Sequence, residues 1–88
     1  MIQLLDFYAD WCGPCQVMKP IFKEIEKDYE GKVEFRQVDV ETDGAAEAAQ
    51  YGVMSIPTFV ILKEGKEVSR KIGAMPKDVL RNWIDNNL

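Results

Sequence analysis

The spacing of apolar residues changes along the chain and predicts where strands and helices alternate. Residues 3–9 form a nearly continuous apolar run interrupted by Asp6, which is typical of a buried strand. Between residues 18 and 29, apolar side chains recur every three or four positions, and this period predicts a helix. Pro20 lies inside this helix, where we expect it to cause a kink, and Gly31 ends it.

The middle of the chain predicts a second strand, a short helix and a hairpin. Residues 33–40 alternate loosely between apolar and polar, as a strand does. Thr42 is suited to cap a short alanine-rich helix that runs to residue 50. Residues 58–62 are strongly apolar and β-branched, and a Lys-Glu-Gly-Lys turn joins them to a final strand at 67–72.

The last element is an amphipathic helix that Pro76 opens at its first-turn position. Its expected apolar face consists of Val79, Leu80, Trp83, Ile84 and Leu88. The element order is therefore β-α-β-α-β-β-α, and the crossover between the first two strands makes them parallel. We expect an α/β fold with a four-stranded mixed sheet and helices on both faces. The first strand is expected to be central, which makes Asp6 a buried acid.

Composition and charge narrow the class of protein. A chain of 88 residues is expected to form a single domain, residues 1–88. A net charge of −4 argues against nucleic-acid partners, which normally require a basic stripe. No apolar run approaches the roughly 20 residues that cross a bilayer, and the start of the chain lacks the basic residues of a signal peptide. We therefore expect no membrane partner and a cytoplasmic location.

The two cysteines carry the candidate chemistry. Cys12 follows the first strand and precedes the helix, so its sulfur is expected at the helix N-terminus, where the dipole favours a thiolate. Cys15 lies on the first turn and can reach back to Cys12. Gly13 permits the tight turn, and Pro14 suits a position whose amide needs no partner. This pattern predicts attack by Cys12 on a substrate disulfide and release of the substrate by Cys15.

Metal binding is the alternative use of such a pair. Structural zinc sites usually need four cysteine or histidine ligands, and this chain has two cysteines and no histidine. One chain therefore cannot complete a zinc site. An iron–sulfur cluster or a metal shared between two subunits stays open, because two chains supply four thiolates.

Several stretches together resemble thioredoxin. They are DFYADWCGPC at residues 6–15, Pro20, YGVMSIPT at 51–58 and KIGA at 71–74. The resemblance runs through the whole chain, and WCGPC followed by Ile-Pro-Thr is far more specific than a bare pair of cysteines. It implies a thioredoxin fold and thiol–disulfide exchange, with Cys12 as nucleophile and Cys15 as the resolving thiol.

The resemblance also implies roles for residues outside the cysteine motif. Asp6 matches a buried aspartate that accepts or relays the proton of the resolving cysteine, and burial is expected to raise its pKa; a purely structural role is the alternative. Pro57 matches a cis-proline that faces the disulfide and holds the neighbouring backbone open for a substrate strand. The expected substrate platform around Cys12 is formed by Trp11, Met54, Ile56, Pro57, Gly73 and Ala74. Core packing is the alternative for Trp11, and Trp83 is expected in the core.

The chain departs from the family pattern in three places. It lacks the strand and helix that usually precede the first strand here, so the strand at 33–40 is expected at a sheet edge. Tyr8 stands where many members carry tryptophan. Gln37 stands where many carry a lysine near the buried aspartate, and without that cation Asp6 is expected to ionise less readily.

The resulting functional prediction is a protein-disulfide reductase and electron carrier in cell redox homeostasis. The resemblance implies a monomer that binds no cofactor and is itself reduced by a separate thioredoxin reductase. Its expected partners are that reductase and proteins with exposed disulfides. An oxidase or isomerase is the alternative within the same chemistry, and a dimeric cluster-binding or interaction module is the alternative outside it. Glutathione-dependent activity is disfavoured, because no carboxylate clamp for glutathione is evident.

Overall fold

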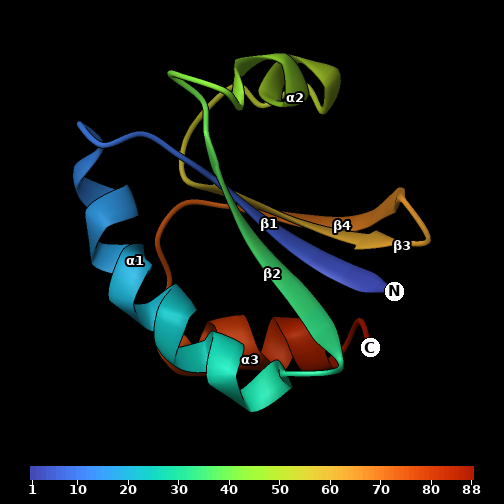
Figure 1. Ribbon diagram of the computed structural model, residues 1–88. Coiled ribbons are helices and arrows are strands. Elements are labelled where there is room, and N and C mark those ends of the chain that lie inside the picture. The colour runs from blue at the N-terminus through green and yellow to red at the C-terminus, as the bar shows by residue number, and fades with distance from the viewer.

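A computed structural model describes residues 1–88 (Figure 1). Its elements are β1 (Ile2–Tyr8), α1 (Gly13–Glu26), a short 3₁₀ helix (Lys27–Tyr29), β2 (Val33–Asp39), α2 (Ala45–Gln50), β3 (Thr58–Lys63), β4 (Lys66–Ile72) and α3 (Lys77–Asp85). The predicted order β-α-β-α-β-β-α is confirmed, with the strand boundaries shifted by about one residue. None of the helices has both the length and the apolar character needed to cross a membrane.

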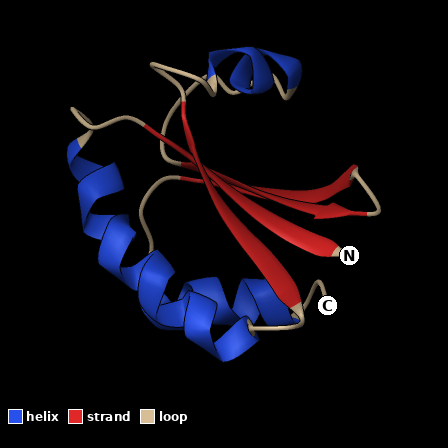
Figure 2. Cartoon of the chain, viewed as in Figure 1, coloured by secondary structure: helices blue, strands red, loops and turns tan.

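The four strands form one mixed sheet in the order β2-β1-β3-β4. β1 runs parallel to β2 and antiparallel to β3, while β3 and β4 form an antiparallel hairpin. In Figures 1 and 2, α1 and α3 lie on one side of the sheet and α2 lies on the other. The α/β fold class, the interior position of β1 and the edge position of β2 are thus confirmed.

Alternation along β1 divides the apolar core into two parts. Leu4 packs in the cluster beneath α1 and α3, while its neighbour Leu5 packs in the cluster beneath α2. On the α1 side, the Phe22 ring lies 4.9 Å from the Phe35 ring and 6.3 Å from the Phe59 ring, between centroids. These contacts fix α1 against the sheet, and with it the position of the cysteines at its first turn.

The start of α2 differs from the sequence prediction. The helix begins after Gly44, and no side chain caps it. Thr42 instead donates a hydrogen bond to Asp43 within the preceding turn. The expected cap was wrong because Gly44 is buried against the end of β2, where its amide donates to the carbonyl of Asp39 at 2.9 Å. That contact places the first helical residue, Ala45, two positions later than the Thr42 cap predicts.

The last helix also differs in detail. Pro76 is the N-cap of α3 and precedes its first turn. Of the expected apolar face, Leu80, Trp83 and Ile84 are buried, whereas Val79 and Leu88 are exposed. Leu88 follows the end of the helix, and Val79 lies beside the packed stripe, so neither reaches the sheet. Trp83 belongs to the core as predicted, and its indole N–H donates to Ser69 at 2.8 Å.

Candidate active site

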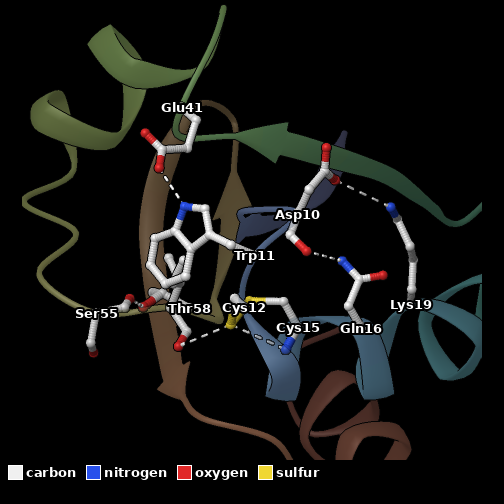
Figure 3. The surroundings of a disulfide bond; sticks show 10 residues. Asp10, Trp11, Cys12, Cys15, Gln16, Lys19, Glu41, Ser55 and Thr58 are labelled. Carbon is white, nitrogen blue, oxygen red and sulfur yellow. Dashed lines mark hydrogen bonds and ion pairs between the residues drawn. A yellow bond between two sulfur atoms is a disulfide. The ribbon is translucent and has the colours of Figure 1, made fainter.

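The cysteine pair lies at the junction between β1 and α1 (Figure 3). Cys12 is the N-cap residue of α1, with extended backbone angles, and Pro14 stands in the first turn. Cys12 and Cys15 form a disulfide bond with their Cα atoms 5.2 Å apart. Both are almost fully buried, with 5% of Cys12 and 3% of Cys15 exposed. Only a small part of the Cys12 surface is therefore accessible from outside.

The environment of the Cys12 sulfur favours negative charge. Its Sγ accepts a hydrogen bond from the backbone N–H of Cys15 at 3.2 Å. This amide belongs to the first turn of α1, whose free N–H groups carry the positive end of the helix dipole. After reduction, the same position stabilises a Cys12 thiolate, which is the reactive form in disulfide exchange.

Pro57 lies directly before β3 and follows Ile56, the residue whose carbonyl contacts the disulfide. The Ile56–Pro57 peptide bond is cis, and the Cys12 sulfur lies 3.8 Å from the carbonyl oxygen of Ile56. Two bonds hold this segment: the Thr58 hydroxyl donates to the Ser55 carbonyl at 2.6 Å, and the Gly73 amide donates to the Pro57 carbonyl at 2.8 Å. The backbone before β3 is thereby fixed directly against the redox pair.

Asp6 is the one buried carboxylic acid of the fold, with 1% of its surface exposed. Burial raises its pKa from an ordinary value of 3.8 to about 7, because the charged form loses its hydration. The Gln37 amide and the Lys19 ammonium group lower this pKa, but by less than burial raises it. Asp6 Oδ1 and Gln37 Nε2 are each buried without a completed hydrogen bond. Burial thus brings the pKa of this acid into the neutral range.

An apolar groove of about 530 Å³ opens beside Cys12. It runs toward α2 and is lined by Trp11, Cys12, Gly13, Pro14, Val40, Ala48, Val53, Met54, Ser55 and Ile56. Of the predicted platform, Trp11, Met54 and Ile56 line this groove, whereas Pro57, Gly73 and Ala74 do not. Met54 is 94% exposed at its rim. Seven of the ten residues that line the groove are hydrophobic.

Trp11 stands at the mouth of the groove and is 71% exposed. The alternative of core packing for this tryptophan is therefore wrong. Its indole N–H donates to the Glu41 carboxylate, which follows β2 (Figure 3). This bond fixes the solvent-exposed indole ring of Trp11 next to the disulfide.

Several residues at the site are absent from the sequence prediction. Glu41 has no sequence signal that connects it with Trp11, because the two are brought together only by the pairing of β1 with β2. Lys19 lies one helical turn after Cys15, and this spacing is a signal that could have placed it near the site. The groove wall formed by Val40, Ala48, Val53 and Ser55 depends on the packing of α2. No group of three or more histidine, cysteine or acidic side chains is arranged to hold a metal ion.

Comparison with known proteins agrees with this geometry. The family model for thioredoxin matches residues 1–86. The thioredoxins of Staphylococcus aureus strains Mu50 and MW2 are each 42% identical to this chain over 87 residues, which cover 99% of this chain and 83% of each relative. A solved mutant thioredoxin from Halobacterium salinarum NRC-1 is 34% identical, with a TM-score of 0.86 over 97% of this chain and 73% of that one. The chain therefore belongs to the thioredoxin family, and its paired cysteines make it a thiol–disulfide oxidoreductase.

Proposed function

We propose that this protein reduces disulfide bonds in other proteins by dithiol–disulfide exchange. The observation that carries the proposal is the placement of the Cys12 sulfur at the N-terminus of α1, where the Cys15 amide donates to it at 3.2 Å. A sulfur so placed is a good nucleophile in the reduced protein and a good leaving group in a mixed disulfide.

In the first step, the Cys12 thiolate attacks one sulfur of a substrate disulfide. A bond forms between Cys12 and that sulfur, and the other substrate sulfur leaves as a thiolate that takes a proton from solvent. The substrate is now held covalently against the groove. The exposed ring of Trp11 and the exposed side chain of Met54 provide its apolar contacts.

In the second step, Cys15 resolves the mixed disulfide. Asp6 in its carboxylate form accepts the Cys15 proton, and the Cys15 thiolate attacks the Cys12 sulfur. The Cys12–Cys15 disulfide forms, and the second substrate sulfur leaves as a thiolate, so that the substrate gains the two electrons that the cysteine pair loses. A pKa of about 7 suits Asp6 to this task, because both protonation states are populated at neutral pH.

Substrate recognition is proposed to use the backbone as well as the groove. The Ile56 carbonyl faces the Cys12 sulfur, and Pro57 has no amide hydrogen that could compete for the Cys12 thiolate. An extended substrate segment can therefore pair with this backbone as an added strand does. Gly73, whose amide donates to the Pro57 carbonyl, and the adjacent Ala74 are proposed to complete the platform.

The oxidised protein needs an electron donor before its next cycle. We propose a separate thioredoxin reductase as that donor, with no cofactor bound to this chain, and the cytoplasm as the compartment. The 42% identity with thioredoxins and the WCGPC run support this assignment.

The proposal is tested by trapping the mixed disulfide with a Cys15→Ser variant. The substrate is a model protein that has one exposed disulfide and whose free thiols are blocked by alkylation. We expect this variant to accumulate a covalent complex with it, and dithiothreitol should cleave that complex. The matched control is Cys12→Ser, which keeps the second cysteine but lacks the nucleophile and should trap far less. Equal trapping by both variants, or trapping by neither, would refute the assigned roles.

A further inference from the structure

Lys19 is held in a defined place on the inner side of α1. It lies one turn after Cys15 and is only partly exposed, with 32% of its side chain accessible. Its ammonium group stands 4.9 Å from the centre of the Tyr8 ring and 3.8 Å from the Asp10 carboxylate. Figure 3 shows Lys19 reaching from α1 toward Asp10, whose carbonyl also accepts a bond from Gln16.

The Tyr8 ring connects this lysine with the buried acid. Asp6 and Tyr8 are two positions apart on β1, so their side chains lie on the same face of the sheet. Because its ammonium group lies over the Tyr8 ring, Lys19 is on the same face of the sheet as Asp6.

No other element places a charge on Asp6. In the sheet, β2 offers the neutral Gln37 opposite Asp6, and β3 offers Phe59. Burial raises the pKa of Asp6, while the Gln37 amide and the Lys19 charge lower it, and Lys19 is the one ionic group with an effect. Asp6 itself is buried, so its interaction with the Lys19 charge is screened less than an interaction between two surface charges.

We propose that Lys19, held between the Tyr8 ring and the Asp10 carboxylate, is a positioning residue that supplies the positive charge under which Asp6 ionises and accepts the Cys15 proton. The inference rests on the proposed function, because it assigns Lys19 a part in the resolving step. The inference also explains why Lys19 makes two contacts and does not extend freely into solvent. The Tyr8 ring and the Asp10 carboxylate restrict the movement of its side chain and so keep its charge in place.

The first test measures the Asp6 carboxyl directly by carbon NMR as a function of pH, in the oxidised protein, where the cysteines do not titrate. The variant is Lys19→Met, which keeps the length of the side chain and removes its charge. We expect the Asp6 pKa to rise by several tenths of a unit. Lys19→Arg, which keeps the charge and can stack on Tyr8, should leave the value close to that of the parent.

The matched control is Lys23→Met, which removes the same charge one turn further along α1. Lys23 is exposed and takes part in none of the ion pairs of the structure. This variant should leave the Asp6 pKa unchanged. An unchanged Asp6 pKa in Lys19→Met, or equal shifts in Lys19→Met and Lys23→Met, would overturn the inference whatever the activity of the variants.

The second test links the charge to the reaction. The rate at which a preformed mixed disulfide on Cys12 is resolved should rise with pH as Asp6 ionises, and Lys19→Met should move this profile to higher pH by the same amount as the pKa. An Asp6→Asn variant distinguishes the coupling of Lys19 to Asp6 from the role of Asp6 as proton acceptor. If Asp6→Asn resolves the mixed disulfide as fast as the parent while the NMR shift is present, the proton-acceptor role of Asp6 fails and the coupling of Lys19 to Asp6 stands.

Discussion

Replacing Asp6 with asparagine removes the one carboxylic acid that the fold buries between the sheet and α1. Asparagine has the shape of the neutral acid but cannot ionise, so the variant isolates the consequence of burying a charge. The folded protein holds the Asp6 pKa at about 7, whereas an unfolded chain restores the ordinary value of 3.8. The folded state thus binds the proton more tightly than the unfolded state does.

The sign and size of the effect follow from this difference. Below about pH 3 the acid is protonated in both the folded and the unfolded state, so burying it does not lower the free energy of unfolding. As the pH rises from 3.8 toward 7, the unfolded state releases the proton first, so the free energy of unfolding of the parent falls. The difference of about three pKa units corresponds to about 4 kcal/mol once the pH exceeds about 8. The asparagine variant escapes this loss and should exceed the parent in stability by a margin that grows with pH.

The assay is urea denaturation of both oxidised proteins at a series of pH values from about 4 to about 9. We expect the stability margin of Asp6→Asn over the parent to increase by about 4 kcal/mol across this range, with about half of the increase reached near pH 5 to 6. Glu30→Gln is the matched control, because it removes an exposed carboxylate that is outside every ion pair. A margin that does not change with pH would refute the reasoning.

Two further substitutions test the packing at the start of α2 and the bond that holds Trp11. Gly44→Ala should destabilise the fold by about 1–3 kcal/mol in chemical denaturation, because a Cβ at this position would lie 2.6 Å from the Asp39 carbonyl oxygen. The control is Gly13→Ala, whose Cβ meets nothing within 4 Å and which should change stability far less. Equal losses of stability in the two variants would contradict the explanation. Glu41→Gln should loosen the Trp11 ring by weakening its charged hydrogen bond, which we expect to raise the KM for a protein disulfide while kcat changes little. Unchanged KM and unchanged Trp11 fluorescence anisotropy would show that the bond does not hold the ring in place.

The architecture could be predicted largely from local patterns. The apolar run of β1, the three-to-four-residue period of α1 and the hairpin between β3 and β4 each indicate one kind of element. The central position of β1 follows from its two-sided burial, since Leu4 and Leu5 enter different halves of the core. The junction between β1 and α1 then places Cys12 at a helix N-terminus, which the sequence indicates without any structure.

What could not be predicted depends on contacts between segments far apart in the chain. Thr42 has the chemistry of a cap, but the close packing of Gly44 against Asp39 decides where α2 begins. The bond from Trp11 to Glu41 spans 30 positions and depends on the register of two strands. Lys19 carries the spacing of a residue near the site, yet only the fold shows that it lies over an aromatic ring on the face that contains the buried acid.

The central claim is that Cys12 and Cys15 form a reducing dithiol pair. The most direct measurement is the reduction potential of this couple, followed through Trp11 fluorescence in buffers of defined thiol composition. The account predicts a value near the roughly −270 mV known for thioredoxin. A value between roughly −120 and −180 mV would identify an oxidase or isomerase instead, and failure to form the disulfide at any potential would contradict the exchange mechanism itself.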